Sequence, residues 1–210
     1  MRARAQILLF LLFFSGNDWE LRKNEDNIRV YTRRITTSDF KELQCKTTVK
    51  ATLGSIIKLL ADDNNFPQWI YGCIKSSHIK NNGTTESYAY QLFDVPWPFD
   101  DRDVVAVGRI SQDSKTKIVT IKSESVDGLL PENEGIIRIK NFHSSYILIP
   151  KPNGVVDINF EMGSEPGGVV PAWLVNMVII KGPFLTHKKL TELLQTPVYK
   201  NVKLDFIEEL

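Results

Sequence analysis

The sequence has few cysteines and almost no net charge. Its two cysteines, Cys45 and Cys73, show neither CxxC spacing nor a zinc-binding pattern. Both lie in strand-like runs, so we predict two buried free thiols, with a disulfide as the alternative. Lys and Arg total 26 and Asp and Glu total 25, a net charge of +1. This balance provides no overall basic field for a phosphate backbone and disfavours nucleic acid as a partner.

Recognisable catalytic and metal-binding motifs are also absent. The three histidines lie on separate predicted elements: His78, His143 and His187. Their spacing fits neither a zinc site nor a histidine dyad, and no GxSxG, HExxH or phosphate-binding glycine loop occurs. Asp100, Asp101 and Asp103 surround Arg102, which favours a local ion-pair cluster over a metal or catalytic site. We therefore predict no enzyme activity, no metal and no cofactor.

The N-terminus has a short apolar run but no hydrophobic stretch long enough to span a bilayer. Arg2 and Arg4 precede the run from Ile7 to Phe14, as in a secretory signal peptide. Residues 1–16 are therefore predicted to be a signal peptide or an apolar leader. The protein is then exported to the periplasm or secreted; without cleavage it is cytoplasmic, and the run is an apolar first helix.

The remaining composition is that of a folded chain. Hydrophobic residues make up 42% and charged residues 24% of the 210 residues, enough to bury a core. No linker, repeat or low-complexity stretch interrupts residues 17–210, so we predict one domain there, monomeric by default.

Hydrophobic periodicity predicts many strands and two helices. The helices are expected at 52–63, with Thr52 as N-cap, and at 171–195, with a kink at Lys181-Gly182-Pro183. Strands are expected at 19–23, 28–34, 40–50, 73–80, 85–94, 102–112, 115–124, 135–142, 145–150 and 155–162. Short polar breaks between them predict hairpins, hence a long, curved antiparallel sheet in an α+β fold.

Alternation along three strands indicates which side chains face the long helix. The expected inward sets are Val156, Ile158, Phe160 and Met162; Val104, Ala106, Gly108 and Ile110; and Ser87, Ala89, Gln91 and Phe93. The opposite face of the middle strand, with Asp103 and Arg109, is expected to meet solvent. Small inward residues leave room for a ligand, unless large side chains such as Trp173, Phe142 and Tyr146 fill the space.

Three segments resemble a known family in their order and spacing. They are WEL with IRVYTR (19–21 and 28–33), DVPWPFDDRDVV (94–105) and PAWLVN (171–176). Together they resemble the START (steroidogenic acute regulatory protein-related lipid transfer) domain over almost all of residues 19–195. The Pro-Trp-Pro stretch before Arg102-Asp103 is the most specific part.

The resemblance implies a helix-grip fold, in which a long curved sheet wraps around the C-terminal helix and leaves an internal hydrophobic cavity. It also implies a tunnel for one lipid, with a gate formed by the loop at 95–101 and the helix around 173–183. Sterol-carrying members share a buried acid–base pair, which this chain replaces with Ala89 and Gly108. Losing both charges together is physically coherent and makes the pocket more apolar. Gln91 is then the remaining polar group to orient a ligand.

The function predicted is binding and transfer of a lipid or other hydrophobic small molecule, with transient membrane contact. The alternatives are an enzyme of the polyketide cyclase/aromatase kind, which needs His143, Asp157 or Glu161 to point inward, and a ligand-free interaction module. The predicted ligand-binding residues are Ala89, Gln91, Phe93, Trp97, Val104, Ala106, Gly108, Ile158, Phe160, Met162, Trp173, Met177, Ile180 and Phe184.

Overall fold

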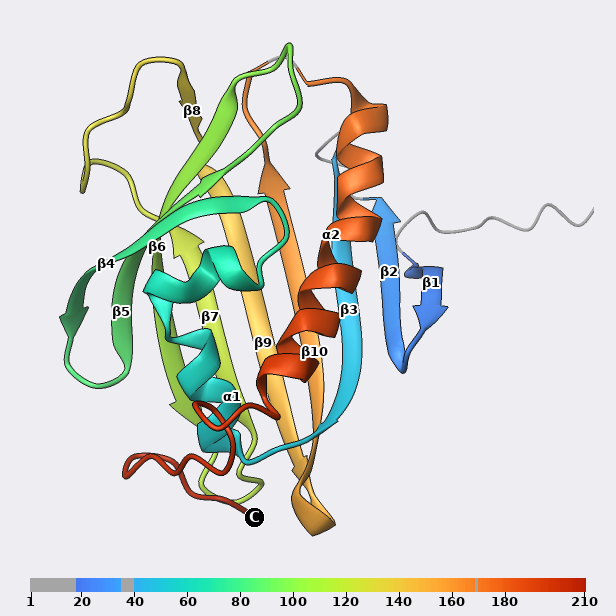
Figure 1. Ribbon diagram of the computed structural model, residues 1–210, viewed down its shortest axis with the longest axis vertical. Helices are drawn as coiled ribbons and strands as arrows, with labels where there is room; N and C mark the ends of the chain where they lie inside the picture. The colour runs from blue at the N-terminus through green and yellow to red at the C-terminus, as the bar shows by residue number, and fades with distance from the viewer. Residues whose placement is uncertain (1–17, 35–39, 169) are drawn as a thin grey trace, which may run out of the picture.

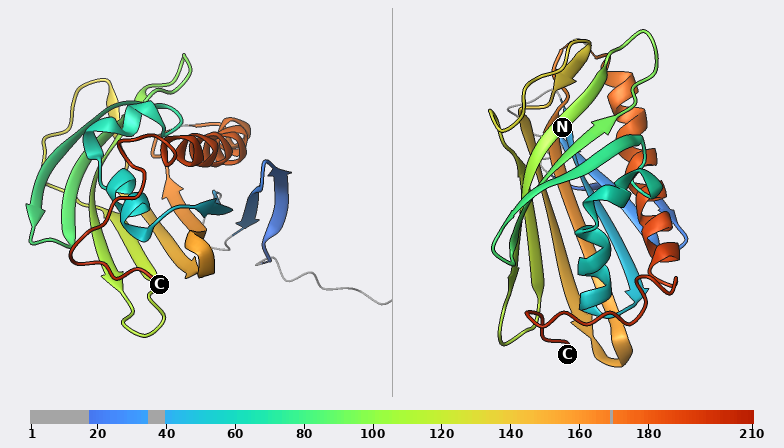
Figure 2. Two further views of the ribbon diagram at one scale, coloured as in Figure 1. Left: turned by 60° about the horizontal axis from the view of Figure 1, so that its bottom comes forward. Right: turned by 60° about the vertical axis from the view of Figure 1, so that its left-hand side comes forward.

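The computed structural model describes residues 18–34, 40–168 and 170–210, so the predicted leader at 1–16 lies outside the described residues. Ten strands form one sheet in the order β1-β2-β3-β10-β9-β7-β6-β5-β4, and β8 pairs with β6. The sheet curves around the two α-helices, which lie on the same side of it (Figures 1 and 2). This arrangement confirms the predicted α+β fold with a long curved sheet wrapped around the C-terminal helix.

The elements follow the sequence periodicity with a few shifts at their ends. The helices are α1 (Leu53–Leu60) and α2 (Ala172–Leu193), with short 3-10 helices η1 (Asp63–Gln68) and η2 (Pro152–Gly154). The strands are β1 (Glu20–Glu25), β2 (Ile28–Arg34), β3 (Lys41–Lys50), β4 (Cys73–Asn82), β5 (Glu86–Phe93), β6 (Asp101–Gln112), β7 (Val119–Ser125), β8 (Ile136–Arg138), β9 (Asn141–Lys151) and β10 (Val155–Glu165).

The region from residue 126 to 151 differs from the prediction. Two strands were expected, with a break at His143-Ser144, but β9 runs unbroken through it because no Gly or Pro interrupts the alternation there. The short strand β8 pairs with β6 in parallel, so this part of the sheet is not an antiparallel meander.

The segment leading to β8 covers the outer face of β6, which corrects a second expectation. Asp103 and Val105 were placed on a solvent face, yet they are 1% and 0% exposed. Arg138 joins the Asp103 side chain to this segment, because its guanidinium donates to the Asp103 carboxylate and to the backbone carbonyls of Leu130 and Pro131. Further along, Arg109 is exposed as expected.

The aspartate cluster around Arg102 is organised differently from the prediction. Asp103 pairs with Arg138, whose Nε and Nη2 lie 2.6 and 3.1 Å from the two carboxylate oxygens. Arg102 instead donates to the backbone carbonyls of Asp100, Pro166 and Gly167. Within the described ranges, no three His, Cys, Asp or Glu side chains are grouped so that they could hold a metal ion.

The C-terminal tail, residues 196–210, packs back against α1. Thr52 caps α1 as predicted, its Oγ1 accepting from the Ser55 N–H at 3.1 Å. The Glu209 carboxylate then accepts from the N–H groups of Leu53 and Gly54 at 2.8 and 2.9 Å. Four N–H groups at a helix start lack partners within the helix, so the tail satisfies two that Thr52 leaves free.

The described hydrophobic core consists of two separate clusters. The larger one joins α1, the last turn of α2 and the tail to one end of the sheet. The smaller one contains Ile28, Val30, Cys45 and Phe184, where α2 meets β2 and β3. Both cysteines are buried and free, which confirms the prediction and excludes the disulfide. Neither described helix is long and apolar enough to cross a membrane.

Candidate functional site

The predicted pocket residues of β5 and β6 share one face of the sheet. Ala89 lies opposite Ala106, Gln91 opposite Val104, and Gly108 opposite Ser87. Further along the same face of β6, Ile110 packs against the larger core cluster, which shows that this face turns toward the helices. Neither Ala89 nor Gly108 carries a charge, so these two strands hold no acid–base pair at those positions.

The predicted residues of β10 and α2 meet across the interior. The Phe160 ring lies 5.5 Å from that of His187 on α2, and Phe184 is buried against Cys45. Ile158 is fully buried, whereas Met162 and Ile180 are half-buried. The side chains of Trp173 and Met177 lie outside the described residues.

The interior is incompletely filled by the side chains that the structure describes. Several residues on the helix-facing side of the sheet remain half-buried, among them Gln91, Gly108, Ser123, Ser144, Tyr146 and Phe160. Tyr146 is the clearest case, because burial raises the pKa of its phenol while part of the side chain stays accessible. A half-buried residue on this side is not fully covered by its neighbours, so accessible surface remains between the sheet and α2.

One predicted pocket residue lies elsewhere. Trp97 belongs to the loop between β5 and β6 and is 92% exposed, so its ring points into solvent. Gln91, the predicted polar group, does lie on the helix-facing side and is half-buried.

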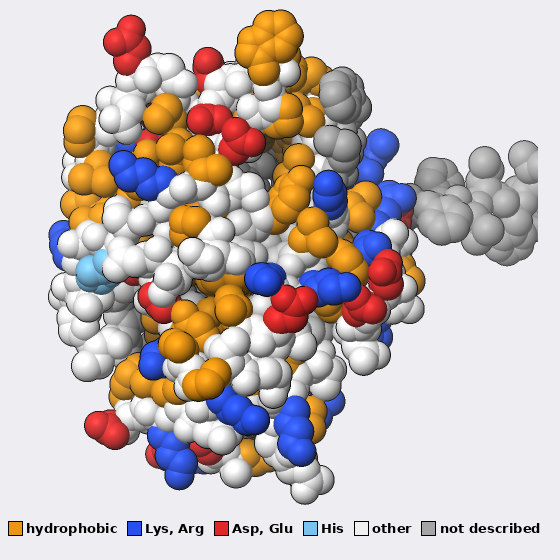
Figure 3. Space-filling model, in the orientation of Figure 1, with side chains coloured by type: hydrophobic (Ala, Val, Ile, Leu, Met, Phe, Trp, Pro, Cys, Tyr) orange, Lys and Arg blue, Asp and Glu red, His pale blue; other side chains and the backbone are white. Residues whose placement is uncertain are grey.

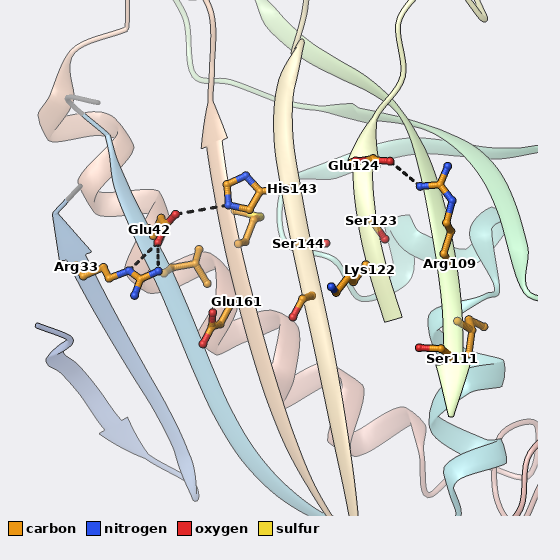
Figure 4. A pocket seen from close by; sticks show the side chains of 14 residues that line it. Arg33, Glu42, Arg109, Ser111, Lys122, Ser123, Glu124, His143, Ser144 and Glu161 are labelled. Atoms are coloured by element: carbon orange, nitrogen blue, oxygen red, sulfur yellow. Dashed lines mark hydrogen bonds and ion pairs between the residues drawn. The ribbon is translucent and has the colours of Figure 1, made fainter. Parts of the chain in front are cut away.

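A second hollow lies on the face of the sheet opposite α2, and the sequence did not predict it. It is a groove of about 470 Å³. In Figure 4, Arg33 and Glu42 form one wall and Arg109 and Glu124 the other, with α2 behind the strands. Each wall is an ion pair, with N–O distances of 2.6 Å for Arg33–Glu42 and 2.5 Å for Arg109–Glu124.

The three side chains that a cyclase-type site would need point away from the interior. His143 and Glu161 line the outer groove (Figure 4). Asp157, on the same face of β10 as Glu161, accepts a hydrogen bond from the Thr48 hydroxyl at 2.7 Å. The described interior therefore receives no acid or base from these positions.

Sequence reasoning missed the histidine that does enter the interior. His187 is 0% exposed, and burial lowers its pKa to about 4. Its ring lies 6.1 Å from that of Tyr146. The sequence did contain a signal for this position. His187 lies four residues after Pro183, so the two share one face of an apolar helix.

Comparison with known proteins identifies the family. A model described as the START domain matches residues 3–200. The chain belongs to the START domain family. A STAR-related lipid transfer protein from Xanthomonas axonopodis superposes with a TM-score of 0.78 at 32% identity, covering 85% of this chain and 99% of that one. The expected resemblance is thereby confirmed.

Other proteins similar to this chain are uncharacterised or more distant. An uncharacterised protein of Pseudomonas aeruginosa is 31% identical over 176 residues, covering 83% of this chain and 86% of its own. The phosphatidylcholine transfer protein of Mus musculus is 22% identical over 172 residues, covering 80% and 79%. The human StAR-related lipid transfer protein 5 shares the fold, with a TM-score of 0.74 at 14% identity, over 85% of this chain and 86% of that one.

Proposed function

We propose that this START domain binds one lipid between the sheet and α2 and transfers it between membranes, without catalysing a reaction. The observation that carries the proposal is the accessible surface left on Tyr146 and its neighbours, on the side of the sheet that faces α2. Family membership supports lipid binding in general. Burial of an acyl chain provides about 0.8 kcal/mol per CH₂, so an apolar interior alone supplies useful affinity.

Entry and release are proposed to occur where the β5–β6 loop faces the start of α2. Arg102 connects the two segments, donating to the carbonyl of Asp100 in the first and to those of Pro166 and Gly167 before the second. Arg102 is only 4% exposed. Opening this end requires those hydrogen bonds to break, so their strength limits how readily a lipid enters or leaves.

Apolar groups for brief membrane contact lie on the β5–β6 loop and along the first half of α2. Trp97 is 92%, Val178 40% and Tyr71 36% exposed. Lys181 Nζ lies 5.5 Å from the centre of the Tyr71 ring, so a cation accompanies the aromatic side chain. Figure 3 shows hydrophobic side chains among Lys and Arg on the face that carries α2. Amphipathic aromatic rings and lysines suit a membrane–water interface.

The test of the binding site is a substitution that fills the interior. Gly108→Leu adds a large side chain on the half-buried inner face of β6. Ser111→Leu adds the same side chain on the exposed outer face of the same strand and serves as the control. Native mass spectrometry should show a co-purified lipid in the wild type and in Ser111→Leu, and little in Gly108→Leu. A wild type without lipid, or equal loading of all three proteins, contradicts the proposal.

The test of the membrane-contact step is transfer of a pyrene-labelled diacylglycerol, an uncharged lipid with a free hydroxyl group, between vesicles. Trp97→Ala should slow transfer several-fold while lipid loading stays unchanged. Phe206→Ala, at an exposed aromatic residue in the C-terminal tail, is the matched control. If both variants transfer at the wild-type rate, the loop does not carry the membrane contact.

A further inference from the structure

Helix α2 brings one ring nitrogen into the interior without a partner. Nδ1 of His187 lies 2.9 Å from the Pro183 carbonyl oxygen, one turn earlier in the helix. A carbonyl oxygen only accepts, so Nδ1 carries the hydrogen and Nε2 keeps its lone pair. Nε2 is buried and has no hydrogen-bond partner among the residues that the structure describes.

An unpaired acceptor in the interior is costly, and native proteins seldom keep one without a reason. His187 is 0% exposed, so water does not satisfy the nitrogen from outside. The surroundings are aromatic, with the Tyr146 ring at 6.1 Å and the Phe160 ring at 5.5 Å between centroids. A hydrogen-bond donor must therefore come from something that enters the space beside these rings.

Tyr146 supplies a second polar group on the opposite wall. Its ring is nearly parallel to that of His187, at an interplanar angle of 29°. The phenol makes no hydrogen bond to any described residue, and the side chain is half-buried. A further unpaired hydroxyl, Thr47 Oγ1, belongs to β3 on the same side of the sheet, where Thr47 lies opposite Ile158.

We propose that His187 and Tyr146 form the polar end of the lipid site and bind a hydroxyl group of the ligand. The ligand O–H donates to His187 Nε2, and its oxygen accepts from the Tyr146 phenol. One hydroxyl meets both requirements at once, when the Phe160 ring turns aside to admit it. This inference rests on the proposed function and narrows the ligand to an uncharged lipid that carries a hydroxyl group.

The charges around the site agree with an uncharged ligand. Burial lowers the pKa of His187 to about 4 and raises that of the Cys45 thiol to about 12, so both are neutral near pH 7. Lys188, the next residue on α2, pairs with Asp26 at an exposed position. Arg102, the buried cation on β6, is occupied by three backbone carbonyls. A carboxylate or phosphate beside His187 would lack a counter-charge among the described residues.

The experiment compares hexadecanol with its methyl ether, which keeps the oxygen but lacks the hydrogen to donate. Native mass spectrometry titrations of the full chain give both dissociation constants. The wild type should bind the alcohol about ten-fold more tightly than the ether, the effect of one net hydrogen bond. His187→Leu should remove that preference, while His143→Leu, at the outer groove, should retain it. Tyr146→Phe should weaken binding of both compounds several-fold and leave their ratio unchanged.

Two results would overturn the inference. The first is equal affinity of the wild type for alcohol and ether, and the second is a preference that survives in His187→Leu. Both leave lipid binding itself intact, whereas binding of neither compound, with no co-purified lipid, contradicts the proposed function. Circular dichroism verifies folding of each variant. If His187→Leu does not fold, wild-type affinity of Tyr146→Phe for both compounds overturns the inference.

Discussion

Arg138 and Asp103 form a two-pronged ion pair with N–O distances of 2.6 and 3.1 Å, although they lie on different strands. Both side chains are buried, at 3% and 1% exposure. Arg138 also donates to the carbonyls of Leu130 and Pro131, so one guanidinium holds the covering segment against β6.

Removing one member of this pair should be strongly destabilising. Arg138→Leu leaves a buried carboxylate without a counter-charge, and we expect the free energy of unfolding to fall by about 3–5 kcal/mol. Urea denaturation followed by tryptophan fluorescence measures the change. Arg109→Leu breaks exposed ion pairs on β6, the strand that carries Asp103, and should have a much smaller effect. An equal fall in the free energy of unfolding of both variants would show that the buried pair stabilises the protein no more than the exposed ones.

Two helical glycines should respond oppositely to the same substitution. A Cβ on Gly54 in α1 would lie 2.6 Å from the Val202 carbonyl oxygen of the tail. Gly54→Ala gains about 1 kcal/mol in helix propensity, but the overlap of the new Cβ with the tail backbone costs more. We therefore expect the free energy of unfolding to fall by about 1–3 kcal/mol. A Cβ on Gly182 in α2 meets only side-chain atoms, the nearer at 3.4 Å. Gly182→Ala should be neutral or stabilising, and a neutral Gly54→Ala would show that the tail does not pack as described.

His187 should make stability depend on pH. Its pKa is lowered from 6.5 to about 4 in the folded protein, so the unfolded chain binds a proton more readily. The contribution of His187 to the free energy of unfolding is complete above about pH 6.5. It decreases by roughly 3 kcal/mol as the pH drops toward 4. Tyr146, whose ring faces His187, and Cys45, which acts on Tyr146, have raised pKa values and stay neutral throughout. Urea unfolding between pH 4 and 7 measures this, and the free energy of unfolding of His187→Phe should depend less on pH than that of the wild type. The same pH dependence in both proteins would show that His187 is not the group responsible.

The two thiols should be unreactive in the folded protein. Burial raises the pKa of Cys45 to about 12 and that of Cys73 to about 11, which leaves little thiolate near neutral pH. Labelling with a maleimide should be slow under native conditions and should reach two groups per chain in denaturant. Rapid native labelling, or no labelling after unfolding, would argue against buried free thiols.

Local patterns predicted most of the fold. The alternation in β10 and the cap at Thr52 are consequences of neighbouring residues, and the structure follows them. The covering segment was missed because it depends on Arg138 meeting Asp103, two residues far apart in sequence. From the neighbouring residues alone, a charged residue in an apolar strand is predicted to face solvent. Here a partner far away in the sequence makes its burial favourable.

The candidate site, like the fold, was predicted where local patterns determine it. Strand alternation brought Ala89, Gln91 and Ala106 to one face, and the register confirms it. Trp97 was included because the resemblance implied a gate at the loop 95–101, but loop side chains have no periodicity to indicate their direction. The unpaired nitrogen of His187 was beyond sequence reasoning, because it depends on which atoms surround the ring after folding.

The pairing of β3 with β10 has a consequence for how the protein is made. Lys50 lies opposite Val155, so a strand from early in the chain receives its neighbour only after most of the sheet has been synthesised. Until then β3 presents an unpaired edge beside the apolar side chains of Leu43 and Val49. Sheets closed by such distant contacts fold slowly, and a free strand edge invites association with other chains. The newly made N-terminal strands therefore need protection until β10 arrives, and the rate at which the ribosome delivers it sets how long that interval lasts.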